Sequence, residues 1–318
     1  MARKIIIDTD PGIDDALAIF YALAAPELEI LGLTTVFGNG STQMSTANAL
    51  HLLEIAGRTD IPVAHGAERP MGMAFQGGAP QVHGADAQGN LFLPAPAGKP
   101  VSMHAAQFII DQVMAAPGEI TLVPLAPLTN IALAFLLKPD LPQYIREIVL
   151  MGGAAFVPGN ITPAAEANIW NDPEAADIVF GADCNIVMIG LDVTEHLFLP
   201  GSRLEQFASL GNPRADHLAR ILPCYRDFHV RQLGLDGIHV HDSSTISYLL
   251  RPDLFTLEGH PVRVELTGLG RGKTWPAVGR SDVESAWAGR RPIQIAVKVD
   301  ADAALALEWE HHSRTLGR

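Results

Sequence analysis

The chain has 318 residues, of which 48% are hydrophobic and 18% are charged, and this composition excludes a protein that is disordered as a whole. Its 35 acidic side chains outnumber the 22 lysines and arginines, so the formal net charge is −13, which argues against a nucleic-acid polymer as partner. The N-terminal apolar run Ile5–Ile7 ends in an acid, and no run approaches the roughly 18 residues of a membrane span, so we expect neither a signal peptide nor a membrane protein. The two cysteines, Cys184 and Cys224, indicate no disulfide framework and favour the cytoplasm.

The first forty residues predict a βαβ unit, with a strand at 5–7, a helix at 16–24 and a second strand at 30–37. Further strands are predicted near 61–65, 119–124, 146–151 and 185–190. Helices are predicted near 43–56, 102–115, 128–137, 173–181, 214–232 and 243–251. This order indicates one α/β domain over 1–318, with a mostly parallel, Rossmann-like open sheet flanked by helices.

Two stretches depart from the alternation of strands and helices. The Gly/Pro/Ala-rich stretch 66–100 is longer than an ordinary connection and is typical of a functional or mobile loop. The Val/Thr/Gly-rich region 255–299 predicts a small antiparallel addition to the sheet.

Four aspartates, Asp8, Asp10, Asp14 and Asp15, follow the first predicted strand within eight residues. In open parallel sheets the ligand lies beyond the carboxyl ends of the strands, which is where these acids stand. A helix N-terminus offsets only about 0.3–1 kcal/mol per nearby carboxylate, too little for four of them, whereas one or two would be explained as helix caps. A divalent cation is the remaining source of positive charge, and an irregular set of oxygen ligands favours Ca²⁺ over Mg²⁺.

Two other polar segments carry candidate functional residues. Segment 237–243 holds His239, His241 and Asp242 directly before a predicted helix, so Asp242 is either a helix cap or part of a site. Segment 157–174 offers hydrogen-bonding side chains that suit a polyhydroxylated ligand such as a sugar, namely Asn160, Glu166, Asn168 and Asp172. For Asp172, which precedes a proline, we favour a helix cap.

Together these residues resemble the inosine-uridine-preferring nucleoside hydrolases. The stretch from Asp8 to Asp15 is similar to the signature of that family. The similarity continues, in the expected order, through Gly38-Asn39, Pro127–Asn130, Met151–Gly153, 160–168 and His241-Asp242. It implies a calcium-dependent enzyme that hydrolyses small-molecule nucleosides to ribose and a free purine or pyrimidine base, with the base preference open.

The resemblance also implies roles for individual residues. Asp10, Asp15, Asp242 and the backbone carbonyl of Ala126 would hold Ca²⁺. Asp10 would take a proton from the attacking water, and His241 would protonate the leaving base. The remaining expected contacts to substrate are Asp14, Asn39, His83, Met151, Asn160, Glu166, Asn168, Tyr225, His229 and His239.

Several expectations stay open at this level. Asp8-Thr9-Asp10 also allows a phosphatase with Asp8 as nucleophile, and a calcium-dependent ribose- or nucleoside-binding protein without activity is a further alternative. The loop that helps close the site in the family usually reads Gly-Leu-Gly where this chain has Ala87-Gln88-Gly89, so closure by loop 77–90 is undetermined. Relatives form dimers or tetramers, which predicts a homo-oligomer.

Overall fold

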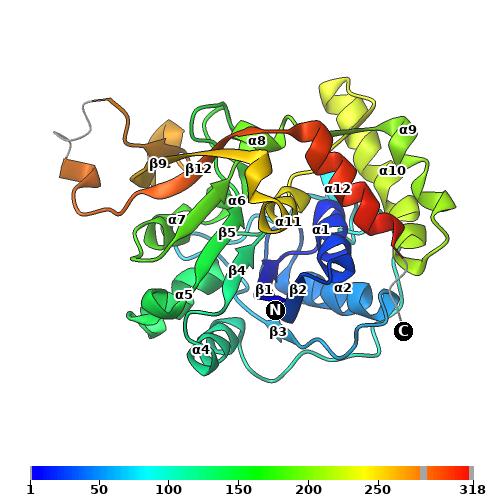
Figure 1. The fold of residues 1–318 in the computed structure, drawn as a ribbon, viewed down its shortest axis with the longest axis horizontal. Helices are drawn as coiled ribbons and strands as arrows, with labels where there is room; N and C mark the ends of the chain where they lie inside the picture. Colours follow the sequence, from blue (N-terminus) through cyan, green and yellow to red (C-terminus); the bar gives the residue numbers. More distant parts are fainter. Residues whose placement is uncertain (1, 280–284, 315–318) are drawn as a thin grey trace.

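The centre of the molecule is a twisted sheet in the order β3-β2-β1-β4-β5-β6-β12-β9, seen in a computed structural model that describes residues 2–279 and 285–314 (Figure 1). Neighbouring strands are parallel, except that edge strand β9 runs antiparallel to β12. The strands are β1 (Arg3–Thr9), β2 (Leu28–Thr35), β3 (Val63–His65), β4 (Thr121–Pro124), β5 (Glu147–Met151), β6 (Ile186–Ile189), β9 (Phe255–His260) and β12 (Ile293–Val299).

Helices cover both faces of the sheet (Figure 1). One face carries α1 (Ile13–Ala24), α2 (Thr42–Ile55), α10 (Pro213–Leu233), α11 (Ser243–Leu250) and α12 (Ala301–Ser313). The other carries α4 (Ala105–Ala115), α5 (Thr129–Leu137) and α7 (Pro173–Phe180). Shorter elements are the helices α3 (Pro80–His83), α6 (Ala167–Asn171), α8 (Leu191–Thr194) and α9 (Gly201–Leu204), and the antiparallel pairs β7 (Phe198–Pro200) with β8 (Gly237–His239) and β10 (Val262–Val264) with β11 (Thr274–Pro276).

The central strands are apolar on both faces because each face packs against a helical layer. In β1, Ile5 and Ile7 belong to one hydrophobic core and Ile6 to the other. In β5, Val149 and Leu150 divide in the same way. This is the reason why these strands appear in the sequence as continuous apolar runs.

The predicted elements between residues 5 and 251 are present, with ends that differ by three residues or fewer. Helix α1 starts at Ile13, before the predicted start at 16, because Asp15 accepts a hydrogen bond from the Gly12 amide and closes the first turn. The antiparallel addition is confirmed, but β12 joins the parallel sheet beside β6 instead of staying in the addition. Residues 280–284 of that predicted region lie outside the described residues.

Helix α12 was missing from the sequence prediction. Its signal is Asp300, whose carboxylate accepts a hydrogen bond from the Ala303 amide at the start of an Ala/Leu/Glu-rich run. Among the described residues, no helix combines the length and the hydropathy needed to cross a membrane.

Asn130, at the start of α5, braces the ends of the first two strands. Its side-chain amide donates to Asp8 Oδ1 at 2.8 Å and to the Thr35 carbonyl at 3.0 Å, and its Oδ1 accepts from the Ala67 amide at 2.9 Å. Burial raises the pKa of Asp8 to about 7. These contacts hold β1 and β2 in register at the sheet edge where the acidic turn begins.

Asp172 joins three segments and caps α7, as the sequence indicated. It is fully buried, and its oxygens accept from the Ala175 amide at 3.1 Å, the Thr129 hydroxyl at 2.6 Å and the Met71 amide at 3.1 Å. We expect Asp172→Ala to lower the free energy of unfolding by about 2–3 kcal/mol, because three buried donors lose their acceptor. Urea unfolding measures the loss, Asp172→Asn should lose less, and a change below about 0.5 kcal/mol for Asp172→Ala would contradict this assignment.

Candidate active site

The candidate site lies beyond the carboxyl ends of the parallel strands, between β1 and β4, where the chain leaves the sheet in opposite directions. Asp10 follows β1, Asn39 follows β2, and Ala126 follows β4. Asp14 and Asp15 form the first turn of α1, and Asp242 directly precedes α11. The fold therefore brings together acids that are more than 200 residues apart in the sequence.

Asp15 is held by polar groups of its own turn. Its Oδ1 accepts from the Thr9 hydroxyl, and its Oδ2 accepts from the Gly12 amide at 3.0 Å and from Asn39 Nδ2 at 3.2 Å. The side chain is fully buried, and this burial, together with the charge of Asp14, raises its pKa to about 6. Its partners are neutral donors, so they orient the carboxylate without neutralising it.

Asp10 is bound on one side only. Its Oδ2 accepts from the Asn39 amide at 2.6 Å, whereas its Oδ1 is buried without a hydrogen-bond partner. Gly38 permits this approach, because it has a φ of +157° and any Cβ there would collide with Asp10 Oδ2. Burial and the neighbouring charge of Asp15 raise the pKa of Asp10 well above its ordinary value.

Among the described residues, Asp14, Asp15 and Asp242 each place one carboxylate oxygen within 4.8 Å of the other two. We call these three residues the acid cluster. Asp14 Oδ1 is also buried without a hydrogen-bond partner, and burial raises its pKa to about 6. Desolvation and the charges of the surrounding acids raise the pKa of Asp242 well above its ordinary value. Such a cluster needs a positive charge close by.

The geometry decides one of the two alternatives for Asp242. Its side chain makes no capping hydrogen bond to α11, so the helix-cap alternative is wrong for this residue. The neighbouring His241 is held by a residue that the sequence did not indicate, because its Nδ1 lies 2.8 Å from the Thr194 hydroxyl at the end of α8. The division of Asp14 to sugar and Asp15 to metal stays a prediction, although both belong to the acid cluster.

The sugar-contact residues predicted in segment 160–168 are engaged with the backbone. The Glu166 carboxylate accepts from three amides, those of Gly153, Asn168 and Ile169, at 2.8–3.1 Å. Asn168 Nδ2 donates to the Leu125 carbonyl at 2.8 Å and to the Met151 carbonyl at 3.3 Å. Asn160 is exposed, and its Oδ1 accepts from the Ala167 amide. Their contacts to a ligand stay predictions, with Asn168 Oδ1 and Asn160 Nδ2 unused by these bonds.

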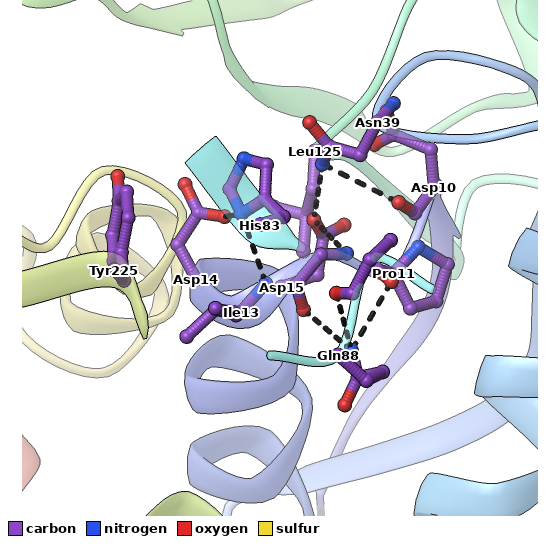
Figure 2. Close-up of polar contacts among 12 residues, drawn as sticks. Asp10, Pro11, Ile13, Asp14, Asp15, Asn39, His83, Gln88, Leu125 and Tyr225 are labelled. Carbon is purple, nitrogen blue, oxygen red and sulfur yellow. Dashed lines mark hydrogen bonds and ion pairs between the residues drawn. The ribbon is translucent and has the colours of Figure 1, made fainter. Parts of the chain in front are cut away.

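Five ring side chains line up beside the acids. Successive ring centroids are 5.3 Å apart for His83 and Tyr225, 4.5 Å for Tyr225 and His229, 5.5 Å for His229 and His239, and 5.9 Å for His239 and His241. Figure 2 shows Tyr225 and His83 on the two sides of Asp14. The end of α3, helix α10, and the chain from β8 to His241 thus contribute to one wall of the site.

Burial keeps the histidines of this wall neutral. Burial lowers the pKa of His83 to about 4, while burial and repulsion by neighbouring histidines lower the pKa of His239 to about 4 and that of His241 to about 3. His83 Nδ1 accepts from the Ile13 amide at 3.2 Å, which fixes the proton of this neutral ring on Nε2. Nδ1 of His83 is 3.8 Å from Asp14 Oδ1, too far for a hydrogen bond.

Three supporting residues carried no recognisable sequence signal. Lys273 is buried and donates to the carbonyls of Ala154 and Val157, at 2.5 and 3.0 Å. Asp192 accepts from the amides of Ala155 and Phe156. Thr194, described above, completes this set. They are single residues in ordinary surroundings, and only the path of the folded chain shows that they hold loop 152–166 and His241.

Known proteins of similar sequence and fold point to one enzyme family. A family model described as inosine-uridine preferring nucleoside hydrolase matches residues 5–306. The chain is 44% identical over 308 residues to the probable uridine nucleosidase 2 of Arabidopsis thaliana, which covers 96% of both chains. It is 43% identical over 269 residues to the pyrimidine-specific ribonucleoside hydrolase RihA of Photobacterium profundum, which covers 84% of this chain and 86% of that protein. The solved structure of a plant nucleoside hydrolase, PpNRh1, matches with a TM-score of 0.95 and 39% identity, covering 99% of this chain and 100% of the other.

The acid cluster leads to a prediction about stability without metal. We expect Asp242→Asn to raise the free energy of unfolding by about 1–2 kcal/mol in EDTA at pH 8, because one of several mutually repelling charges is removed. The pKa values of Asp14 and Asp15 are raised from 3.8 to about 6, so the folded protein loses stability as the pH rises from about 4 to about 6 and these acids ionise. The stability gained by Asp242→Asn should therefore be larger at pH 8 than at pH 5.

Urea unfolding at the two pH values measures this effect. The exposed Asp302 provides the control, since Asp302→Asn removes the same charge from the surface of α12 and should change stability by no more than about 0.5 kcal/mol. A loss of stability for Asp242→Asn in EDTA at pH 8 would show that the cluster is not under electrostatic strain.

Proposed function

Since the chain belongs to the inosine-uridine preferring nucleoside hydrolase family and is a ribonucleoside hydrolase, we propose that it cleaves pyrimidine nucleosides, with uridine foremost, using Ca²⁺ held at the acid cluster. The observation that carries the metal proposal is the cluster itself. Among the described residues, none of Asp10, Asp14, Asp15 and Asp242 forms an ion pair with a lysine or arginine.

The donor set fits a hard divalent cation. The buried oxygens Asp10 Oδ1 and Asp14 Oδ1 have no hydrogen-bond partner, and the cluster carboxylates converge within 4.8 Å. We propose Asp10, Asp15, Asp242 and the Ala126 carbonyl as ligands, with Asp14 placed to contact the ion or the ribose. When bound, Ca²⁺ supplies the missing positive charge and lowers the pKa of water within its reach.

Asp10 is suited to the role of general base. One oxygen is fixed by the Asn39 amide, which orients the carboxylate, and the other has no hydrogen-bond partner. Its buried Oδ1 is therefore free to accept a proton from a water molecule in the site. We propose that it accepts a proton as water attacks the ribose carbon that bears the base.

The negative charge of the site suits the reaction. Breaking an N-glycosidic bond builds positive charge on the ribose ring, as in other glycoside hydrolyses, and nearby carboxylates stabilise that charge. The acids Asp10, Asp14 and Glu166 are buried, so water screens their effect on the sugar only weakly.

His241 is proposed to deliver a proton to the departing base. Its Nδ1 is occupied by the Thr194 hydroxyl, which leaves Nε2 for the substrate. Burial lowers the pKa of His241 to about 3, so the resting ring is neutral, and the proton that it gives to the base would first have to be taken up from solvent as the substrate binds. The preference for pyrimidines is supported by the names of the relatives, a uridine nucleosidase and a pyrimidine-specific hydrolase.

The phosphatase alternative loses support from the position of Asp8. This residue is 1% exposed, and its Oδ1 accepts from both Thr34 and Asn130 below the acidic turn. A nucleophile needs an open approach from the substrate, which this carboxylate lacks. Assembly into a homo-oligomer stays a prediction.

A reducing-sugar assay over a nucleoside panel tests the reaction, the base preference and the metal together. We expect ribose release from uridine to be at least about 10-fold faster than from inosine, an order that one well-made contact to the base can produce. EDTA should abolish turnover, and Ca²⁺ should restore it. Full activity after removal of all divalent metal would overturn the calcium proposal, and a preference for inosine would overturn the pyrimidine proposal.

The acid role of His241 is tested by comparing leaving groups. We expect His241→Ala to slow uridine hydrolysis by about 100-fold or more and to slow p-nitrophenyl riboside far less, because nitrophenolate leaves without a proton. Asp10→Ala should abolish hydrolysis of both substrates and serves as the reference. Equal losses on the two substrates for His241→Ala would assign this residue to binding or structure instead.

A further inference from the structure

We propose that Gln88 is a positioning residue for Asp15, acting through the two peptide groups of the acidic turn. The proposal deepens the metal site of the proposed function, because Asp15 is one of the proposed ligands. Gln88 is 3% exposed and lies on the loop that follows His83. Figure 2 shows its side chain against the turn, on the opposite side from Asp10.

The first contact is to the peptide group between Pro11 and Gly12. The Pro11 carbonyl accepts from Gln88 Nε2 at 3.2 Å and from Asn48 Nδ2 at 3.1 Å. The amide of the same peptide group, Gly12 N–H, donates to Asp15 Oδ2 at 3.0 Å. Donors on the carbonyl side fix the peptide plane and polarise its N–H, which strengthens the bond that orients Asp15.

The second contact is to the peptide group between Gly12 and Ile13. Gln88 Nε2 donates to the Gly12 carbonyl at 2.9 Å, and the Ile13 amide donates to His83 Nδ1 at 3.2 Å. Gln88 and His83 therefore bind opposite ends of one peptide unit. In this way His83 and Gln88 hold the turn that carries Asp15 from two sides.

Gln88 is itself fixed from the far side. Its Oε1 lies 2.9 Å from Nε2 of His217 on α10. Burial lowers the pKa of His217 to about 4, so the ring is neutral and uses its single N–H on this bond. Because the turn offers carbonyl oxygens and His217 offers a donor, only one orientation of the Gln88 amide satisfies both.

The loop carries backbone strain that these contacts hold in place. Ala87 is buried and has a φ of +58°, and Asn90 and Phe92 have φ values of +63° and +46°. The Asp86 carboxylate accepts from the amides of Gln88, Asn90 and Phe92 at 2.6–2.9 Å. Such conformations persist only where the surrounding structure stabilises them. The left-handed backbone conformation of Ala87, next to Gln88, is therefore consistent with a loop that hydrogen bonds hold against the turn.

The direct test compares Gln88→Leu with the wild-type protein in EDTA. Leucine fills similar space but donates no hydrogen bond to the turn. We expect the Gly12 and Ile13 amides, followed by NMR hydrogen exchange, to exchange about 10-fold faster or more in the variant, as the loss of one buried hydrogen bond implies. His217→Phe keeps both donors of Gln88, frees only its Oε1, and should give a smaller acceleration.

Calorimetric titration with Ca²⁺ is the second readout. Loss of an outer-shell partner weakens metal binding by about 10–100-fold, so we expect Ca²⁺ affinity to fall by about 10-fold or more in Gln88→Leu. The matched control is Asp177→Asn, which disturbs the bonds to Arg263, Arg290 and the Val264 amide away from the site. This control should lower the melting temperature. It should leave the Ca²⁺ affinity and the hydrogen exchange of the Gly12 and Ile13 amides unchanged.

The outcomes separate this inference from the calcium proposal. If Gln88→Leu lowers only the melting temperature, as Asp177→Asn does, Gln88 is a structural residue and the inference is wrong. If the wild-type protein binds no Ca²⁺, the calcium proposal fails, and the exchange rates of Gly12 and Ile13 still decide whether Gln88 positions the turn. If Gln88→Leu does not fold, His217→Phe tests whether Gln88 positions the turn. Hydrogen exchange of the Gly12 and Ile13 amides at the wild-type rate in His217→Phe would then contradict the inference.

Discussion

The burial of several carboxylates at one edge of the sheet, with no lysine or arginine of residues 2–279 and 285–314 paired to them, is the constraint on which the rest of the structure depends. Asp10, Asp14, Asp15 and Asp242 are each 9% exposed or less. Neutral donors orient Asp10 and Asp15, but desolvation and mutual repulsion still raise the pKa values of all four. A positive charge at this place would relieve the repulsion, so these acids mark a candidate metal site.

Buried polar side chains hold the loops around the acids. Glu166, Asp192 and Lys273 form hydrogen bonds with backbone groups of residues 152–169, and these bonds fix the path of that segment. Buried backbone groups need such partners, since an unpaired one costs about 1–3 kcal/mol. The segment that carries Asn160 and Asn168 is therefore fixed by hydrogen bonds with buried side chains.

The wall of ring side chains runs beside the acids from His83 to His241. His83 contacts the turn of the acids, and His241 lies at the other end of the row beside Thr194. Because α10 supplies Tyr225 and His229, and also His217 behind Gln88, this helix contacts the site at two points along its length. The row of ring side chains and the acidic turn therefore share one supporting helix.

The sequence by itself determined the order of the main strands and helices between residues 5 and 251, the edge of the sheet where the acids gather, and the crowding of negative charge in the run from Asp8 to Asp15. These follow from local periodicity and from charge density, which neighbouring residues display directly. Only the tertiary structure decided that Asp242 joins Asp14 and Asp15, that Thr194 is the partner of His241, and that Lys273 and Gln88 hold loops in place. The physical reason is that these contacts join residues far apart in the chain. A single lysine or glutamine forms no periodic sequence pattern, and its partner, a backbone carbonyl group, comes within reach only when the chain has folded.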